Sequence, residues 1–294
     1  MVALMLLLPA VSHAKWNEAW SARAKVTINA QGIGAAVNQP PVAVRLHSGN
    51  FSFVDAKPDG SDLRVVAADD KTELKFQIEK FDSINELAII WVQLPKLDPA
   101  DKAAHFWLYY GNEKAGPAEG SKGTWDSNTM AIFHFDGATL LHDASVSQLT
   151  ATGNISVQKA ALLGEAAMFS GQPIRIATAS ALELAKGGGF TYSAWIKPDA
   201  LPQQATLYQQ GTLTIKIDGQ KLALTSGKAV VSGGEIKTAS WQHIAATVGG
   251  GKATLYVNGE PVGSADMALE ESLNQQFNQL SEQAFAPCRD FYAA

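Results

Sequence analysis

Short runs in which hydrophobic and polar residues alternate dominate the first part of the chain after residue 23. Such alternation, with a period of two, is typical of β-strands, whose successive side chains point to opposite faces of a sheet. The runs lie at 25–28, 42–46, 74–79, 87–94 and 106–110, and the run at 87–94 is hydrophobic throughout. Gly, Pro, Asp and Asn fill the gaps and favour turns. The pattern therefore predicts a β-sandwich rather than a βαβ fold.

A small, polar stretch at 113–122, EKAGPAEGSK, separates this block from a second one and predicts a domain boundary. In the second block, strand patterns lie at 131–135, 166–176, 190–196, 213–217, 222–224 and 254–257. Asp218-Gly219 and Asn258-Gly259 predict two β-hairpins. We therefore expect one β-sandwich domain at 15–122 and another at 129–266.

The last part of the chain, 267–294, departs from the strand pattern. The hydrophobic residues that recur there every three or four positions are Leu269, Leu273, Phe277, Leu280 and Ala284. This is the spacing of one face of an α-helix. Glu270 and Glu271 come near the N-terminal end of the run, where the helix dipole favours acidic residues. The sequence therefore predicts a helix over 267–285 within a divergent tail.

Residues 1–14, MVALMLLLPAVSHA, form a hydrophobic run that is too short to span a bilayer. Ser12 and Ala14 fit a signal-peptidase site, with Lys15 as the first residue of the mature protein. A buried first strand is the alternative, but Pro9 and the leucine run without β-branched residues argue against it. No Lys or Arg precedes the run, so we expect the leader to be truncated at its start. Because no later segment reaches about 20 hydrophobic residues, the sequence predicts a periplasmic or secreted protein without a transmembrane segment.

Composition narrows the class of protein further. The 294 residues are 46% hydrophobic and 17% charged, which excludes a disordered chain and a coiled coil. There are 23 Lys and Arg residues and 28 Asp and Glu residues, a net charge of -5 without a basic patch. Nucleic-acid binding is therefore not expected. The one cysteine, Cys288, excludes an internal disulfide framework and a cysteine-based zinc site.

Each block also contains a series of motifs. In the first block these are Trp20 and Arg23, DLRVV at 62–66, WVQLP at 91–95 and YYGN at 109–112. This series resembles a bacterial family of domains of unknown function that precede lectin-like modules in exported proteins. In the second block the motifs are HFDG at 134–137, FSG at 169–171, FTYSAWI at 190–196, WQHIA at 241–245 and LYVNG at 255–259. This series resembles the laminin-G/concanavalin-A-like jelly-roll family.

These resemblances imply a fold and a cellular setting more than a function. The jelly-roll fold hosts sugar binders, protein binders and enzymes alike. The order of the two modules resembles the periplasmic part of proteins that carry, or neighbour, a MotA/TolQ/ExbB-type proton channel. Lectin-like modules of this kind normally end in two more strands, the last pairing with the first strand. The helix-like tail implies either an interrupted reading frame or gene, which we favour, or a helix in place of the closing strands.

The expected fold class is thus all-β, with two β-sandwich domains and a short C-terminal helix. The second domain is expected to be a concanavalin A-like jelly roll that lacks its closing strands. Such a jelly roll would leave the edge of a buried strand unpaired.

No combination of residues predicts catalysis. His134 and His243 lie in strands among hydrophobic residues, which is typical of packed, hydrogen-bonded core histidines. His47, His105 and His142 have no partner at the spacing of metal ligands. The chain has no G-x-S-x-G motif, and no spacing pairs two carboxylates as a glycosidase needs. We therefore expect no enzyme and no catalytic residue.

Binding is the better hypothesis, with few candidate residues. Asp136, Asp143 and Asn258 could supply oxygen ligands to calcium, although turns also explain Asp136 and Asn258. Four tryptophans lie in strands beside hydrophobic residues and are expected in the core; they are Trp91, Trp107, Trp195 and Trp241. Trp125 lies outside the predicted strands and is the candidate for stacking on a ligand.

The sequence thus predicts a non-catalytic exported protein that binds a glycan or a protein surface. The resemblance adds an accessory role in an ExbB/TolQ-like envelope complex for biopolymer transport, with proton-channel or energy-transducer proteins as partners. A free carbohydrate-binding lectin and an ancillary module of a polysaccharide-degrading enzyme are the alternatives. No cofactor is expected apart from calcium.

Overall fold

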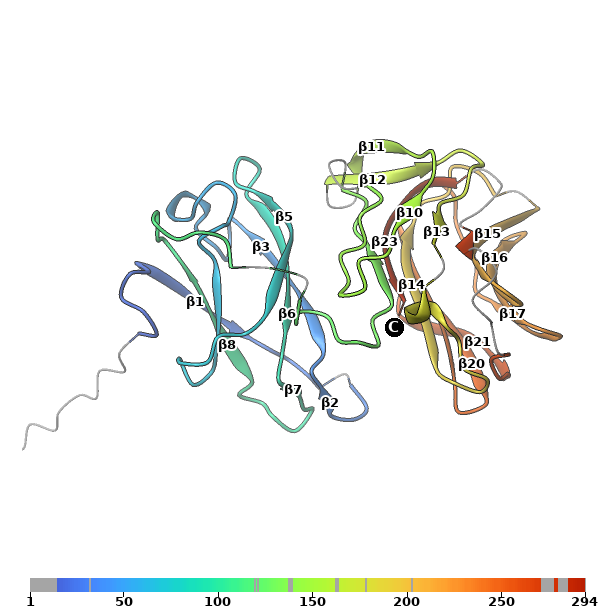
Figure 1. Ribbon diagram of the computed structural model, residues 1–294, viewed down its shortest axis with the longest axis horizontal. Helices are drawn as coiled ribbons and strands as arrows, with labels where there is room; N and C mark the ends of the chain where they lie inside the picture. Colours follow the sequence, from blue (N-terminus) through green and yellow to red (C-terminus); the bar gives the residue numbers. More distant parts are fainter. Residues whose placement is uncertain are drawn as a thin grey trace, which may run out of the picture. The chain divides into compact units, whose positions relative to one another are not determined.

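The computed structural model describes residues 15–31, 33–118, 120, 122–136, 140–161, 164–177, 179–201, 203–270, 278–279 and 285–293. They divide into two compact units, one up to Thr124 and one from Trp125 onwards. Apart from two short 3-10 turns, η1 (Phe53–Asp55) and η2 (Ser180–Leu182), their regular structure consists of β-strands (Figure 1). The predicted all-β class is therefore confirmed. No helix within these residues is long and hydrophobic enough to cross a membrane.

The first unit contains two three-stranded antiparallel sheets. The strands of one sheet are, in order, β1 (Ala22–Thr27), β8 (His105–Tyr110) and β4 (Arg64–Ala67). Those of the other are β3 (Pro41–His47), β6 (Leu87–Gln93) and β5 (Phe76–Asp82). A separate ladder joins β2 (Val37–Asn38) to β7 (Lys96–Leu97). The strands β1, β3, β5, β6 and β8 overlap the five runs of alternating or hydrophobic residues in the sequence.

Two hydrophobic clusters stabilise this unit. The larger one combines buried side chains of both sheets, such as Ile90 on β6 and Leu108 on β8. Tyr109, the next residue on β8, belongs to a second cluster with Trp16 and Trp20. The ring centroid of Trp16 lies 5.0 Å from that of Trp20 and 5.5 Å from that of Tyr109. Residues just after the predicted leader thus cover the opposite side of the β8 strand.

The second unit is a β-sandwich of two main sheets (Figure 1). The strands of the eight-stranded sheet are, in order, β11 (Ser156–Ala161), β12 (Gly164–Phe169), β23 (Phe285–Ala293), β14 (Phe190–Ile196), β19 (Gln242–Gly249), β20 (Lys252–Val257) and β21 (Glu260–Asp266), with β9 (Ala131–Phe133) paired to β23. Those of the four-stranded sheet are β15 (Gln204–Gln210), β16 (Leu213–Asp218), β17 (Lys221–Ser226) and β18 (Ala229–Gly233). A small third sheet contains β10 (Ala151–Thr152), β13 (Arg175–Ile176) and β22 (Asn278–Gln279).

Alternate residues of these strands build the core of the second unit. Tyr192 and Ile196 on β14 are buried in one cluster with Ile215 on β16, so side chains of both main sheets contribute to it. The two predicted hairpins are confirmed as β16–β17 and β20–β21. At the tip of the second, Asn258 has φ 52° and Gly259 has φ 83°, as a type I′ turn requires.

The structure contradicts the predicted C-terminal helix and the predicted absence of closing strands. Residues 267–270 are irregular, 278–279 form β22 and 285–293 form β23; the other predicted helical positions lie outside the described residues. β23 pairs with β12 on one side and with β14 and β9 on the other, and its Phe291 is opposite Phe133 of β9. The large sheet is therefore closed by a C-terminal strand that pairs with the first strand of the unit.

Two local features explain why the C-terminal segment was wrongly predicted to be helical. Met267 and Leu269 are buried in the core of the sandwich as irregular chain, so their spacing reflects packing rather than a helix. Pro287 is unusual for a central strand because it has no backbone N–H. In β23 it lies at an irregularity of the ladder with β12, and the ladder with β14 begins one residue later, at Cys288.

Candidate binding surfaces

The outer side of the large sheet carries half-buried aromatic and polar side chains. On β14, Tyr192 and Ala194 are buried in the core, whereas Ser193 and Trp195 between them are half-buried on the other side. β19 shows the same alternation and places Trp195 opposite His243. We use the name indole face for a group of half-buried side chains on and beside the outer side of this sheet. Its members are Ser193, Trp195, Trp241, His243 and Tyr256.

His243 holds the centre of the indole face in place. Its ring centroid lies 5.4 Å from that of Trp195, at an interplanar angle of 63°. Its Nε2 shares a hydrogen bond of 2.7 Å with the hydroxyl of Ser193. Burial lowers the pKa of His243 from its usual value, so the ring is neutral at pH 7. The face thus combines ring surfaces with uncharged hydrogen-bonding groups.

Asn258, a predicted calcium ligand, has a structural task at the edge of this face. Its backbone N–H donates to the carbonyl of His243 over 2.7 Å. Its Oδ1 accepts the backbone N–H of His243 over 3.0 Å. The side-chain oxygen that calcium would need is therefore engaged in closing the hairpin onto β19.

Asp143, the second predicted calcium ligand, is also occupied. The residue is 1% exposed, and its carboxylate accepts the backbone N–H groups of Ile132, Ser145 and Leu149 and the hydroxyl of Ser145, all within 2.9 Å. Asp136 is half-buried and has an interaction of its own. Among the residues that the structure describes, no three His, Cys, Asp or Glu side chains gather as metal ligands would. The structure thus does not bring the predicted ligands together as a metal site.

The tryptophans reverse the expected pattern of burial. The four that the sequence places in the core, Trp91, Trp107, Trp195 and Trp241, are all half-buried. Trp125, the candidate for stacking on a ligand, is 3% exposed, so its ring offers no open face. The predicted stacking role of Trp125 is therefore not supported by its position. For Trp91, Trp107 and Trp195 the reason is the phase of alternation, because each points to the opposite side of its strand from the neighbouring buried residues. Trp241 lies just before β19.

The two histidines that were predicted to lie in the core differ in their burial. His134 is 9% exposed, as predicted for a core histidine. His243 is hydrogen-bonded, as predicted, but it lies on the outer side of the sheet.

One half-buried tryptophan of the first unit also makes a side-chain hydrogen bond. Trp91 Nε1 donates to the Glu79 carboxylate over 2.7 Å.

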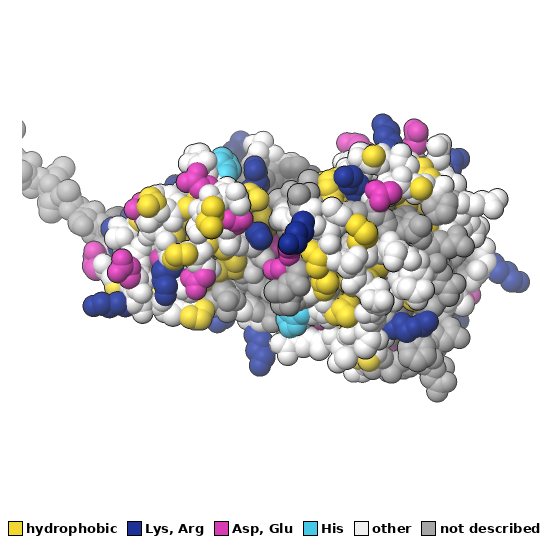
Figure 2. Space-filling view, turned by 90° about the horizontal axis from the view of Figure 1, so that it is seen from above, with side chains coloured by type: hydrophobic (Ala, Val, Ile, Leu, Met, Phe, Trp, Pro, Cys, Tyr) yellow, Lys and Arg dark blue, Asp and Glu magenta, His cyan; other side chains and the backbone are white. Residues whose placement is uncertain are grey.

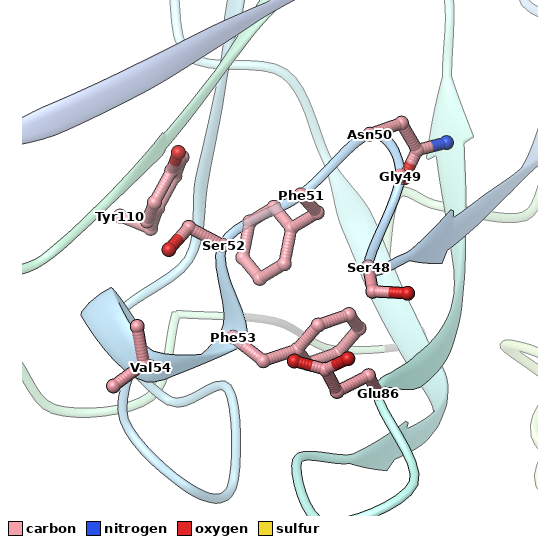
Figure 3. Close-up of a pocket in the computed structure, with 9 residues that line it drawn as sticks. All are labelled: Ser48, Gly49, Asn50, Phe51, Ser52, Phe53, Val54, Glu86 and Tyr110. Atoms are coloured by element: carbon pink, nitrogen blue, oxygen red, sulfur yellow. The ribbon is translucent and has the colours of Figure 1, made fainter.

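The first unit contains a shallow pocket of about 400 Å³ (Figure 3). The loop that follows β3 and the β5–β6 turn line it, together with Tyr110 at the end of β8. The ring of Phe51 lies between those of Tyr110 and Phe53, with centroid distances of 4.5 Å and 4.9 Å. Asn50 fixes the loop, because its Oδ1 accepts the backbone N–H of His47 over 2.8 Å and its amide donates to the carbonyl of Arg45. Sequence reasoning did not find this site.

The charged side chains show no concentrated basic surface on the face drawn in Figure 2. Within its described parts, Lys and Arg side chains are scattered over both units and alternate with acidic and hydrophobic ones. Arg23, one of the cations of the first unit, lies 4.1 Å above the ring of Trp107 and pairs with Asp70.

Three solved structures resemble part of the chain. Domain 4 of AbnA, an extracellular arabinanase from Geobacillus stearothermophilus in complex with arabinotriose, is 19% identical, with 56% of this chain and 91% of that chain covered and a TM-score of 0.45. The receptor-binding domain of botulinum neurotoxin mosaic serotype C/D is 16% identical, with 57% and 47% covered and a TM-score of 0.46. The binding domain of Paraclostridial Mosquitocidal Protein 1 is 15% identical, with 56% and 47% covered and a TM-score of 0.46. The chain thus spans about half the length of these two toxin domains.

Family models match two segments of the chain, and no curated protein matches it. Residues 59–145 match DUF2341, a domain of unknown function. Residues 170–282 match the concanavalin A-like lectin/glucanases superfamily. The two resemblances found in the sequence are thereby confirmed: a segment similar to DUF2341 is followed by a concanavalin A-like lectin segment.

Proposed function

We propose that this chain is a non-catalytic binding protein whose second unit recognises a glycan on the indole face. The proposal is supported by one observation above all, the half-buried indole of Trp195 packed against His243 on the outer side of the large sheet. A second half-buried indole, Trp241, comes directly before β19, two residues from His243 in the chain. The segment that matches the lectin/glucanase family contains the whole face. The flat C–H surface of a sugar ring packs well against an indole. The Ser193 and His243 pair and the phenol of Tyr256 supply hydrogen bonds to sugar hydroxyls.

The composition of these strands favours binding over hydrolysis. Most glycosidases need two carboxyl groups across the scissile bond, about 5–10 Å apart. The strands that carry the face, β14, β19 and β20, contain no Asp or Glu. The alternative is that the chain is an ancillary module of a polysaccharide-degrading enzyme, in which another domain or subunit carries out catalysis. Release of reducing sugar by the purified chain would overturn the non-catalytic assignment.

Replacing Trp195 by Ala is expected to weaken glycan binding about five- to thirtyfold. The substitution removes a ring face that contributes about 1–2 kcal/mol of stacking and burial. The measurement is a glycan array with the purified chain, followed by titration of the strongest ligand. Trp195→Phe, which keeps an aromatic face, is expected to retain most of the affinity. Equal binding by the wild type and Trp195→Ala, with unchanged Tm, would place the ligand elsewhere.

We also propose that the protein is exported and that its leader is removed after Ala14. Support comes from the hydrophobic run before Lys15 and from the position of Trp16, which already packs on Trp20 and Tyr109. N-terminal sequencing of the exported protein is then expected to begin with Lys15-Trp16. A periplasmic or secreted location would suit a protein that binds glycans. An N-terminus inside the folded unit, beyond Trp20, would contradict this proposal.

We further propose that this binding protein is an accessory of an ExbB/TolQ-like proton channel. A free lectin is the alternative. The accessory role is supported by the order of the two modules alone. The channel proteins are expected to co-purify with the wild-type chain from the native envelope after mild cross-linking. Recovery of the chain without them would favour the free lectin.

A further inference from the structure

His243 is held from both neighbouring strands of the large sheet. On the β14 side, its Nε2 shares a hydrogen bond of 2.7 Å with the hydroxyl of Ser193. On the β20 side, the backbone N–H of Asn258 donates to its carbonyl over 2.7 Å, and the Asn258 Oδ1 accepts its backbone N–H over 3.0 Å. Both the backbone and the ring of His243 therefore have a fixed position.

This fixed ring supports the indole of Trp195. The two residues are opposite each other on β14 and β19, and their ring centroids lie 5.4 Å apart at an interplanar angle of 63°. Within the described part of the chain, His243 supplies the one aromatic contact of Trp195. An edge-to-face pair of this kind contributes about 0.5–1.5 kcal/mol beyond the burial of its surface. A change at the His243 ring is therefore expected to reach Trp195.

The protonation state of His243 decides what its pair with Ser193 offers to a ligand. A neutral imidazole has one donor and one acceptor nitrogen, and a hydroxyl complements either tautomer because it donates and accepts. The Nδ1 atom of His243 has no hydrogen-bond partner among the described residues. The neutral pair can therefore match a sugar hydroxyl in either role. In the protonated ring both nitrogens are donors, so the ring loses its acceptor.

The surroundings of the ring do not favour a positive charge. The strands β14, β19 and β20 contain no Asp or Glu, and Tyr256 is the titratable side chain that β20 adds to the face. The charged residues of the flanking segments are Lys197 after β14, Lys237 before β19 and the exposed Glu260 at the start of β21. Burial already lowers the pKa of His243 in the free chain. A neutral sugar over the ring would remove more water without supplying a counter-charge.

We infer that His243 is the positioning residue of the indole face and that its protonation weakens glycan binding. This inference rests on the glycan-binding function proposed above and adds a regulation of the same site by pH. Linkage gives the reciprocal effect: a glycan that prefers the neutral ring lowers the pKa of His243 when it binds.

The first measurement uses the purified chain without a glycan. NMR follows the histidine ring signals and the indole N–H signal of Trp195 between about pH 7.5 and about pH 4.5, a range that spans the ordinary titration of histidine. His243→Gln identifies the His243 signals by their absence. The Trp195 signal is expected to titrate with the same midpoint as the His243 ring and to lose this dependence in His243→Gln. A Trp195 signal that does not follow His243 would overturn the positioning role.

The second measurement repeats the titration with bound sugar. The probe is the strongest binder among cellohexaose, xylohexaose, mannohexaose and N-acetylchitohexaose, all of which are neutral. The pKa of His243 is expected to be lower in the complex than in the free chain. The Kd is expected to rise about fivefold from the neutral to the acidic end of the range. Backbone amide signals outside the face show whether the chain stays folded.

Two substitutions assign the pH dependence to His243. His243→Gln keeps an amide that can bond to Ser193 but removes the ring and its titration. It is expected to weaken binding about threefold at neutral pH, through the lost support of Trp195, and to make the Kd independent of pH. His105→Gln, the same change in the first unit, is expected to retain the pH dependence of the wild type. Unchanged pH dependence in His243→Gln would overturn the inference.

Failure of this inference can be told apart from failure of the proposed function. If the bound oligosaccharide shifts the Trp195 signal but leaves the pKa of His243 unchanged or raises it, the pH regulation is wrong and the glycan-binding function stands. If none of the four oligosaccharides shifts the Trp195 signal at either end of the pH range, the glycan-binding function is contradicted, and the pH regulation with it.

Discussion

A chain that ends at Ala284 is expected to lose the folded second unit while the first unit remains folded. The truncation removes β23, which pairs with β12 on one side and with β14 and β9 on the other. Two interior strands would become unpaired edges, and the backbone groups that faced β23 would lose their partners. With about 1 kcal/mol net for each hydrogen bond, this loss is comparable to the entire stability of a domain, about 5–15 kcal/mol.

Thermal unfolding and limited proteolysis would measure this effect. The wild-type chain is expected to show a transition for each unit, and the truncated chain is expected to show only that of the first. Removing Ala294 alone, beyond the last residue of β23, is the matched control and is expected to leave both transitions in place. If the chain ending at Ala284 retained a second unit with unchanged Tm, β23 would not be part of the large sheet.

Replacing Asp143 by Ala is expected to destabilise the second unit by about 3–5 kcal/mol. The carboxylate accepts four hydrogen bonds in a site that is 1% exposed, and three come from the backbone of residues 132, 145 and 149. Without it, buried N–H donors on β9 and the following loop lose their acceptor, and each such group costs about 1–3 kcal/mol. The Tm of the second unit should fall by about 10 °C.

Asp199→Ala is the control for this substitution, because Asp199 is exposed. It is expected to change stability by less than 0.5 kcal/mol, as is usual for a surface site. Addition of calcium provides a second comparison. If Asp143 served mainly as a calcium ligand, the wild type would be stabilised by calcium and Asp143→Ala would not. A loss below 1 kcal/mol in Asp143→Ala would contradict the structural role.

Most strands could be predicted from the sequence, because the alternation of hydrophobic and polar residues is a local signal. Phe190–Ile196 is a strand from the first to the last predicted residue, and Asn258-Gly259 forms the expected turn. Strand β23 was missed because Pro287 is unfavourable in a central strand and because hydrophobic residues before it follow a helical spacing. Pairing with β12 and β14 is a non-local interaction that local propensity does not reveal.

The candidate sites could be predicted in part at best. Alternation in FTYSAWI places Trp195 opposite Phe190, Tyr192 and Ile196, so a signal for the indole face was present in the sequence. Trp195 was nevertheless predicted to lie in the core, because it is large and has hydrophobic neighbours in the sequence. The pocket of the first unit had no such signal, because Ser48, Glu86 and Tyr110 come from three separate segments. Only the tertiary structure brings these segments to one pocket.

The most direct test of the glycan-binding proposal uses the seven tryptophans as reporters. Their indole N–H groups give separate signals in a nitrogen–proton correlation spectrum, which can be followed while the strongest glycan ligand is added. We expect the signals of Trp195 and Trp241 to shift with the same Kd, while those of the buried Trp20 and Trp125 stay in place. Shifts confined to Trp125 or to tryptophans of the first unit would contradict the assignment of the ligand to the outer side of the large sheet.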